Sequence, residues 1–277
     1  MKKIVMTGTN GFIGGQLKRR ILQMGYDVIT IEKNTWKKDL CNLWMDPLIR
    51  PGDISCIFHN GANTSVQYRE PDIWEDNYYL TKQLMKFAYE YKVPKFIFAS
   101  TSAIYGNDDF PCNHYGWSKF ISEDYGLSFF DHTETKFIAL RYFNVFGPGE
   151  KRKEKLASVI LQSYLNEKFT LFEGISRDYV YIADVIGANV YAFRHMNSSG
   201  CFEVGTGVAT ETGKFISYAN PKWKQIPVVE CPYENIQNYT CANKNNYMYG
   251  WKPQYTTEEG AREYGEYIRN GSWEYEL

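Results

Sequence analysis

The sequence predicts an α/β fold, in which a doubly wound parallel sheet is followed by a smaller C-terminal lobe. Apolar strand patterns alternate with helical patterns throughout the first half of the chain. A glycine-rich stretch, MTGTNGFIGG at 6–15, joins the first predicted strand to the first predicted helix. With 277 residues, the chain is long for one ordinary domain and short for two independent ones. We therefore expect a principal domain over 1–148, to which 178–205 returns, and a lobe formed mainly by 149–277.

The first half repeats a strand, helix, strand order. Residues 3–8 form a short apolar run typical of a buried strand, and the apolar spacing of 11–25 predicts a helix with Gly25 just past its end. Residues 26–33 supply the next strand and complete one βαβ unit. The same alternation predicts strands at 53–62, 95–101 and 136–147 and helices at 76–92 and 118–130.

The alternation loosens after Gly147-Pro148. Helical spacing returns at 156–168 and within 178–196, which combines the end of a strand with a helix. Short pieces rich in Asn, Tyr and Lys follow, and 256–270 forms a last helix. Apart from 178–205, which returns to the principal domain, these segments are assigned to the smaller lobe.

Composition limits the class of partner. The net charge of -1 and the sequence pI near 6.5 argue against a general binder of nucleic acid or of membrane surfaces, which needs a basic excess. No apolar run approaches the ~20 residues of a membrane span, and the N-terminus lacks a signal-peptide pattern. The six cysteines are scattered without metal-ligand spacing, so we expect free thiols and no metal. A cytoplasmic protein with a small-molecule partner is the expectation.

The glycine-rich stretch predicts a phosphate-binding turn. Gly8, Gly11 and Gly14 lie three residues apart, and Phe12 and Ile13 stand where the helix begins. Glycines let the backbone approach a pyrophosphate closely, and the N–H groups of a helix N-terminus favour an anion. A tight strand-to-helix corner is the alternative. The sequence lacks the Gly-Lys-Ser/Thr ending of a mononucleotide loop, so we expect these five residues to bind a dinucleotide.

Glu32 bears on the identity of that dinucleotide. It ends the second predicted strand, roughly twenty residues beyond the turn, where a carboxylate accepts hydrogen bonds from both hydroxyls of an adenosine ribose. Its charge repels a 2′-phosphate and favours NAD. Lys33, Lys37 and Lys38 follow and could restore NADP binding, so the cofactor is NAD or NADP. A solvated acid at a strand end is the alternative interpretation.

A possible acid/base pair lies in NHYGWSKF, where Tyr115 and Lys119 are four residues apart. On a helix both side chains lie on one face, and an adjacent ammonium, helped by the positive charge of an oxidised nicotinamide, lowers the pKa of a phenol from its ordinary ~10. With 23 tyrosines, a chance match is the alternative. Thr101 and Ser102 end the strand before this helix, at the sheet edge where the cofactor is expected. Either hydroxyl could instead cap a turn.

Five motifs together are similar to the extended short-chain dehydrogenase/reductase family of nucleotide-sugar epimerases and dehydratases. They are the glycine turn, HNGA at 59–62, ASTSAIYG at 99–106, the Tyr115/Lys119 pair and RYFNVFGPG at 141–149. The stretches at 141–159, 171–185 and 202–207 resemble the ADP-glycero-manno-heptose 6-epimerases in their residues and in their order along the chain. The resemblance implies a Rossmann fold, a substrate-binding C-terminal lobe, bound NAD or NADP, and a nucleotide-diphosphate sugar as substrate. It also implies a homo-oligomer assembled through the helix of Tyr115.

The resemblance implies roles for individual residues. Tyr115, Lys119 and Thr101 correspond to the catalytic residues of the family, with Tyr115 and Lys119 also contacting the cofactor. Lys153 corresponds to a second catalytic lysine of the heptose epimerases, which serves the opposite face of a transient ketone. Its surroundings, EKRKEK, are equally typical of a solvated charged run, in which Lys151 or Lys155 could take the role if the register shifts.

Three further residues are expected to bind substrate. They are Asn144, Arg177 and Ser102, and the guanidinium of Arg177 suits a diphosphate. The alternatives are an ion pair of Arg177 with Asp178 or Glu173, and a turn-capping role for Asn144. His59 is expected to be structural.

The implied reaction oxidises a carbinol carbon of the sugar and returns the hydride to the opposite face. The sequence departs from the family pattern in two places. Only nine residues separate Tyr105 from Tyr115, a segment that is usually longer in the family, and ENIQNYTCANKNN at 234–246 lacks the arginine that relatives often offer to the phosphates of the substrate. A hexose 4-epimerase, a 4,6-dehydratase or a keto-sugar reductase therefore remain alternatives. Ser102-Ala103 disfavours the dehydratase, whose pattern has Asp-Glu there. A non-catalytic cofactor sensor or RNA-binding module is the alternative of a different class.

Overall fold

The computed structural model describes residues 2–64, 70–106, 110–150, 159–165, 171–224, 228–230 and 239–271. The chain divides into two compact units. The N-terminal unit comprises Met1–Arg141 and Ile186–Phe202, and the C-terminal unit comprises Tyr142–Val185 and Glu203–Leu277. Each unit therefore combines two separate stretches of the sequence.

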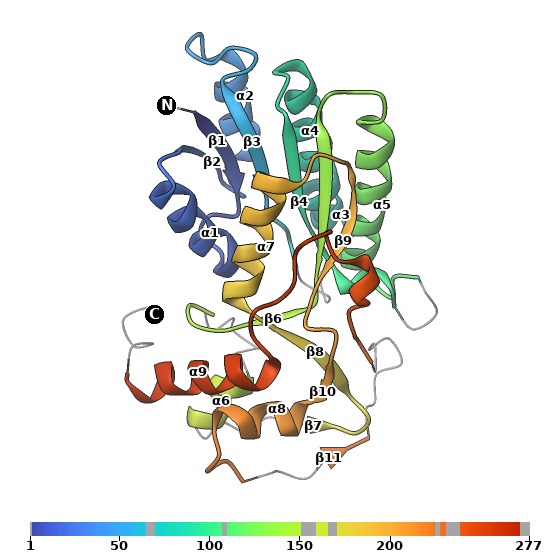
Figure 1. Ribbon diagram of the computed structural model, residues 1–277. Helices are drawn as coiled ribbons and strands as arrows, with labels where there is room; N and C mark the ends of the chain where they lie inside the picture. The colour runs from blue at the N-terminus through green and yellow to red at the C-terminus, as the bar shows by residue number, and fades with distance from the viewer. Residues whose placement is uncertain are drawn as a thin grey trace. The chain divides into compact units, whose positions relative to one another are not determined.

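A six-stranded sheet is the centre of the N-terminal unit, in the order β2-β1-β3-β4-β5-β9 (Figure 1). β1 runs parallel to both β2 and β3, and β3 runs parallel to β4. The chain leaves β1 for β2 and then returns to β3 on the other side of β1, which creates a topological switch point. The strands are β1 (Lys3–Thr7), β2 (Asp27–Ile31), β3 (Ile54–His59), β4 (Lys95–Thr101), β5 (Lys136–Tyr142) and β9 (Gly200–Val204).

Helices cover both faces of this sheet, as Figure 1 shows. On one face, Phe193 of α7 packs its ring against Phe58 of β3, with centroids 5.8 Å apart. On the other face, Ile57 of β3 shares an apolar core with Leu84 of α4. The helices of this unit are α1 (Phe12–Gln23), α2 (Trp36–Met45), α3 (Glu70–Trp74), the π-helical turn η1 (Glu75–Tyr79), α4 (Leu80–Glu90), the short turn η2 (Ser102–Ile104), α5 (His114–Phe129) and most of α7 (Ile182–His195). The predicted doubly wound α/β fold is confirmed.

The C-terminal unit contains a three-stranded sheet in the order β10-β8-β6. β8 runs parallel to β6 and antiparallel to β10. Stacked rings of Tyr179 and Phe215, with centroids 3.8 Å apart, join β8 to α8. The elements are β6 (Asn144–Phe146), α6 (Val159–Leu165), β7 (Leu171–Phe172), β8 (Ser176–Tyr181), β10 (Ala209–Glu211), α8 (Thr212–Ala219), β11 (Val228–Val229), η3 (Lys244–Asn246) and α9 (Thr257–Arg269).

The last helix shows how local sequence defines an element. The Thr256 hydroxyl accepts a hydrogen bond from the Glu259 backbone N–H, and the Glu259 carboxylate accepts one from the Thr256 backbone N–H. This reciprocal cap satisfies N–H groups that a helix N-terminus otherwise leaves unpaired. The predicted helix over 256–270 is confirmed to within one residue at each end.

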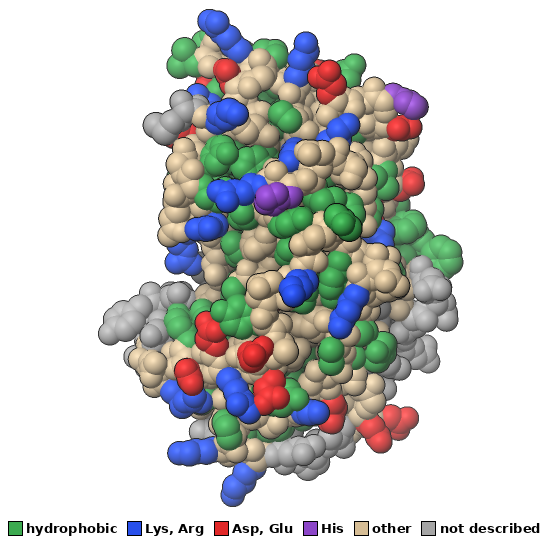
Figure 2. Space-filling view, in the orientation of Figure 1, with side chains coloured by type: hydrophobic (Ala, Val, Ile, Leu, Met, Phe, Trp, Pro, Cys, Tyr) green, Lys and Arg blue, Asp and Glu red, His purple; other side chains and the backbone are tan. Residues whose placement is uncertain are grey.

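The described surface carries charges of both signs. On the face shown in Figure 2, Lys and Arg side chains are interspersed with Asp and Glu side chains, in keeping with the net charge of -1. Within the described ranges, no helix has both the length and the apolar character that a membrane crossing requires.

Candidate active site

The glycine turn is shaped by contacts that exclude side chains. Gly8, which follows β1, has a φ of +69°, and a Cβ on it would lie 2.7 Å from the backbone nitrogen of Gly61. A Cβ on Gly14 would lie 2.1 Å from the carbonyl oxygen of Gly8. These two glycines are therefore required by the strand-to-helix corner itself. For Gly8 and Gly14, this packing agrees with the alternative interpretation of the turn, a tight strand-to-helix corner.

Gly11 has a different environment. It is the N-cap of α1 in an extended conformation, and a Cβ on it would meet only the Gly8 carbonyl oxygen, at 3.2 Å. No side chain caps the start of α1, which opens with Phe12 and Ile13. Gly11 thus leaves the backbone at the helix N-terminus approachable, as a phosphate-binding turn requires.

Glu32 lies beside this turn. Its two carboxylate oxygens accept hydrogen bonds from the Thr9 hydroxyl, at 2.8 Å, and from the Asn10 side-chain amide, at 2.7 Å. The half-buried carboxylate is thereby fixed to the loop that joins β1 to α1. The alternative interpretation of Glu32 was a solvated acid at a strand end, and these hydrogen bonds differ from it.

The lysines after Glu32 have acidic neighbours. Lys33 forms an ion pair with Asp76 at 3.1 Å, and Lys37 forms one with Glu75 at 2.5 Å. Both carboxylates belong to η1. The positive charge that was expected to attract a 2′-phosphate is therefore partly balanced at both lysines.

Tyr115 lies in the first turn of α5. Asn113 caps this helix by accepting a hydrogen bond from the Gly116 N–H at 2.9 Å, so the helix begins four residues earlier than predicted. The Tyr115 phenol is hydrogen-bonded to the Thr101 side chain, and burial raises its pKa to about 12. The expected lowering of this pKa is thus absent, because burial disfavours the phenolate more than the hydrogen bond favours it.

Thr101 ends β4 and has two contacts. Its hydroxyl oxygen accepts a hydrogen bond from the Ala103 N–H at 3.2 Å, which caps η2, and its side chain also bonds Tyr115. The cap and the contact with Tyr115, which were alternatives for this residue, are therefore both present. Ser102 is buried in η2, and its carbonyl oxygen accepts the Tyr105 N–H at 3.1 Å.

Lys119 is buried with an unsatisfied ammonium. It is 1% exposed, and its Nζ lies 4.4 Å from the centre of the Phe98 ring. Among the described residues, its Nζ has no hydrogen-bond partner. Burial lowers the pKa of this ammonium to about 7, although the negative charge of Glu123 acts in the opposite direction. An orphaned buried donor of this kind marks a place where a ligand can supply acceptors.

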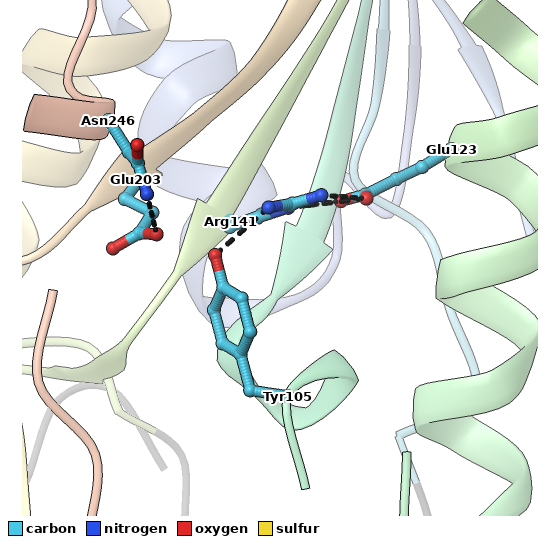
Figure 3. Close-up of polar contacts among 5 residues, drawn as sticks. All are labelled: Tyr105, Glu123, Arg141, Glu203 and Asn246. Atoms are coloured by element: carbon cyan, nitrogen blue, oxygen red, sulfur yellow. Dashed lines mark hydrogen bonds and ion pairs between the residues drawn. The ribbon is translucent and has the colours of Figure 1, made fainter. Parts of the chain in front are cut away.

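An ion pair between a buried carboxylate on the helix of Tyr115 and a partly buried guanidinium was not expected from the sequence. The guanidinium of Arg141, on β5, donates from Nε to Oε1 of Glu123 at 3.0 Å and from Nη2 to Oε2 at 2.7 Å. Its Nη1 donates to the Tyr105 hydroxyl at 2.9 Å (Figure 3). Glu123 follows Lys119 by four residues, and this i, i+4 spacing on α5 was the available signal.

The substrate residues expected on the C-terminal unit lie on its sheet. Asn144 begins β6 and pairs with Tyr179 of β8, so it is a strand residue rather than a turn cap. Arg177 lies on β8, and its Nη1 donates to the Ser176 carbonyl oxygen at 3.1 Å. Lys153, with Lys151 and Lys155, lies outside the described residues.

Asp178, one alternative partner of Arg177, has other contacts. Its buried carboxylate accepts hydrogen bonds from the Thr206 N–H and hydroxyl, the Gly207 N–H and the Ala242 N–H, at 2.7 to 3.0 Å. Nearby, Glu203 accepts a hydrogen bond from the Asn246 side chain at 2.7 Å (Figure 3). Buried carboxylates thus fasten the loops of this unit. In the part of the chain that the structure describes, no cluster of three or more His, Cys, Asp or Glu side chains is arranged to hold a metal ion.

Comparisons with known proteins place the chain in a family. Residues 4–205 match the model of the NAD dependent epimerase/dehydratase family. The structure resembles the UDP-glucose 4-epimerase of Thermotoga maritima solved with UDP-glucose, with a TM-score of 0.82, 26% identity, and coverage of 98% of this chain and 99% of that chain.

Two further solved structures share the fold. The UDP-glucose 4-epimerase of Thermus thermophilus in complex with NAD has a TM-score of 0.80 and 23% identity, covering 96% of this chain and 99% of that chain. The UDP-N-acetylglucosamine 4-epimerase of Methanobrevibacter ruminantium has a TM-score of 0.81 and 24% identity, covering 98% and 99%. Because the family match spans most of its length, the chain belongs to the NAD-dependent epimerase/dehydratase family.

Proposed function

We propose that the protein is a nucleotide-sugar epimerase that oxidises one carbinol carbon of its substrate to a ketone and reduces it again with the same bound NAD or NADP. The observation that carries this proposal is the Tyr115 phenol, which is hydrogen-bonded to Thr101 and lies one helical turn from Lys119, whose ammonium has no hydrogen-bond partner among the described residues. Family membership and the similarity to the Thermotoga epimerase support it.

The residues of the N-terminal unit fit a nicotinamide dinucleotide. The open backbone at Gly11 suits a pyrophosphate, and the Glu32 carboxylate suits the hydroxyls of an adenosine ribose. The Lys119 ammonium finds no acceptor in the described part of the chain, and a second ribose offers acceptors. When bound, the cofactor supplies the acceptance and return of one hydride. The full proposed set is Gly8, Gly11, Phe12, Ile13, Gly14, Glu32, Lys33, Tyr115 and Lys119.

NAD is the favoured cofactor. Glu32 is fixed beside the glycine turn, where its charge repels a 2′-phosphate, and Lys33 already faces Asp76. Solved relatives of the same fold were obtained with NAD. The experiment is a pair of calorimetric titrations, in which we expect NAD to bind at least about tenfold more tightly than NADP. Equal affinities would remove Glu32 from this role.

Tyr115 is the proposed base for the sugar hydroxyl. A phenol with a pKa of about 12 is a poor base at neutral pH, so the loaded enzyme has to lower this pKa. Ribose hydroxyls that accept from Lys119 Nζ would favour the charged ammonium, and a charged ammonium favours the nearby phenolate. Thr101 then orients the reacting oxygen through its hydrogen bond, and Tyr115 returns the proton when the ketone is reduced.

The opposite face of the ketone needs a second proton donor, and we propose Lys153 for it. Asn144 and Arg177 from the C-terminal unit, and Ser102 from η2, are the proposed substrate contacts. Arg177 suits the diphosphate because its guanidinium can pair with two phosphate oxygens. Lys153→Met is expected to slow turnover by about 10²-fold or more, in the range of a lost acid/base group.

Two substrate classes compete. The sequence pattern favours ADP-glycero-manno-heptose with inversion at C6, whereas the similarity to the Thermotoga enzyme fits a UDP-hexose 4-epimerase equally well. Purified protein incubated with a panel of nucleotide sugars, followed by chromatographic separation of the epimers, distinguishes them. Epimer formation from any member supports the proposed function. Loss of water from the sugar would indicate a dehydratase, and stoichiometric consumption of NADPH a reductase.

Absence of turnover with every sugar, together with retained cofactor binding, would favour a non-catalytic sensor or RNA-binding module. Assembly into a homo-oligomer and a cytoplasmic location remain predictions. Light scattering of the purified protein tests the first, and fractionation of cells tests the second.

A further inference from the structure

His59 is a buried titratable residue that the proposed reaction does not use. It ends β3 and has no exposed surface. Its Nδ1 lies 2.7 Å from the Thr7 hydroxyl oxygen, and its Nε2 lies 2.7 Å from the Thr81 hydroxyl oxygen. Both ring nitrogens are therefore engaged with side chains from other elements, β1 and α4.

The neighbouring hydrogen bonds determine the tautomer. The Thr81 hydroxyl donates to the carbonyl oxygen of Asn77, so the Thr81 oxygen has to accept from Nε2–H of His59. Nδ1 is then the acceptor for the Thr7 hydroxyl, whose oxygen accepts the Gly61 N–H at 2.7 Å. The ring is neutral with its proton on Nε2. Burial and the positive charge of Lys119 both lower the pKa of His59, which keeps it neutral.

The hydrogen bonds of His59 continue in two directions. In one direction, through Thr7, they reach the glycine turn. The Gly61 backbone packs so closely on Gly8 that a Cβ on Gly8 would lie 2.7 Å from the Gly61 nitrogen. Thr7 immediately precedes Gly8 on the chain. A change at His59 is therefore transmitted to the turn through both Thr7 and Gly61.

In the other direction, the hydrogen bonds reach the helix of Tyr115. The side-chain amide of Asn77, in η1, donates to the Ser118 hydroxyl oxygen at 3.0 Å, and that hydroxyl donates to the Tyr115 carbonyl oxygen at 2.8 Å. Asn77 also accepts from the Asn63 N–H at 2.6 Å and donates to the Asn63 carbonyl oxygen at 3.0 Å. The same residue thus holds the loop after β3 and the first turn of α5.

We propose that His59 is a positioning residue, whose neutral Nε2–H tautomer joins the glycine turn to the first turn of α5 and so fixes the spacing between the cofactor and Tyr115. The inference rests on the proposed roles of those two parts. The physical reason is that a displacement of about 1 Å between a reacting group and its partner costs on the order of 10²-fold in rate.

The tautomer is tested directly by ¹⁵N NMR of the histidine-labelled protein, without any substrate. We expect one imidazole, assigned by its loss in His59→Asn, to show an unprotonated Nδ1 and a protonated Nε2, with no titration between pH 5.5 and 8.5. A protonated Nδ1, or titration near the ordinary pKa of histidine, would overturn the proposal. This readout is independent of whether the protein turns over a nucleotide sugar.

The coupling is tested by substitution at Thr81. Thr81→Val leaves Nε2–H and the Asn77 carbonyl without a partner, whereas Thr81→Ser keeps the hydroxyl. We expect Thr81→Val to weaken NAD binding about fivefold in calorimetry and to lower kcat about tenfold with little change in KM, and Thr81→Ser to restore both within about twofold. Unchanged NAD affinity and kcat in a folded Thr81→Val protein would contradict the proposal.

A matched control separates positioning from stability. Thr257 is a buried threonine whose hydroxyl donates to the Tyr179 carbonyl oxygen at 3.0 Å, in the C-terminal unit. Thr257→Val is expected to lower the melting temperature as Thr81→Val does, while kcat and NAD affinity stay at the wild-type values. If Thr81→Val and Thr257→Val lose the same stability and also lose kcat and NAD affinity equally, the effect at Thr81 is due to stability alone. That result would overturn the inference. If no nucleotide sugar reacts with wild-type protein, the proposed function fails, and the NMR and calorimetric results still decide the role of His59.

Discussion

Tyr115 and Lys119 lie one turn apart on α5, and burial moves the pKa values of the two groups in opposite directions. The pKa of the phenol rises to about 12, and the pKa of the ammonium falls to about 7. Both shifts favour the neutral forms, because a buried charge is costly without partners. In the proposed function, a ligand therefore has to supply acceptors for the ammonium before the phenol acts as a base.

The pKa of Lys119 predicts a pH dependence of stability. Between about pH 7 and the ordinary lysine value of 10.5, the unfolded chain binds more protons than the folded chain at this residue. The free energy of unfolding should therefore rise with pH from 7.5 to 9.5, by at most ~1.4 kcal/mol per pH unit from this group. Urea unfolding at three pH values measures the slope. Lys119→Met should reduce the slope, and the exposed Lys38→Met should leave it unchanged; equal slopes in all three proteins would refute the assignment.

Tyr115→Phe is predicted to abolish most of the turnover while preserving the cofactor site. The change removes only the hydroxyl, so the loss of an acid/base group should cost about 10²- to 10⁴-fold in kcat. NAD affinity measured by calorimetry should stay within about threefold of the wild-type value. Tyr249→Phe is the control, because Tyr249 is 96% exposed. Turnover that survives in Tyr115→Phe would transfer the role to another group.

Gly14→Ala is predicted to destabilise the glycine turn. The added Cβ would lie 2.1 Å from the carbonyl oxygen of Gly8, a backbone atom that cannot move independently. We expect a loss of about 2 kcal/mol or more in the free energy of unfolding, together with loss of NAD binding. Gly187→Ala, at a position in α7 where a Cβ meets no atom within 4 Å, should instead stabilise the protein by about 0.5–1 kcal/mol. Similar stabilities for the two variants would contradict the packing described for the turn.

Glu123→Gln is predicted to be strongly destabilising. Glu123 is 3% exposed and receives the guanidinium of Arg141 at both oxygens, so its neutralisation leaves a partly buried cation poorly compensated. The cost of breaking such a pair is about 3–5 kcal/mol. Chemical denaturation measures it. The double variant Glu123→Gln, Arg141→Met should recover part of the loss, and a strictly additive result would show that the two side chains do not interact.

Local patterns predicted the strands β1 to β5 and several of the helices, whereas α2 and α8 were not predicted. The spacing of Gly8, Gly11 and Gly14 predicted the turn, and the i, i+4 spacing of Tyr115 and Lys119 placed both side chains on one face of α5. The start of α5 was predicted too late, because NHYG carries no apolar periodicity; Asn113 was the capping signal.

Long-range contacts were beyond such patterns. Arg141 and Glu123 meet because β5 and α5 pack together, and the i, i+4 spacing of Glu123 from Lys119 does not identify Arg141 as its partner. The effect of burial on the pKa of Tyr115 was missed for the same reason, since spacing gives proximity and burial is a property of the whole fold. The predicted lowering of this pKa also counts the charge of an oxidised nicotinamide. The position of Glu32 at the end of the second strand could be predicted from the sequence. Its hydrogen bonds to Thr9 and Asn10 depend on the conformation of the loop and could not.

The central claim, oxidation and reduction by one bound cofactor at Tyr115, is tested most directly by epimerisation in heavy water. Because the hydride returns from the cofactor to the same carbon, we predict that mass spectrometry finds no deuterium at the epimerised carbon of the product. Incorporation of one deuterium at that carbon would show that the substrate is deprotonated there, and would contradict the account.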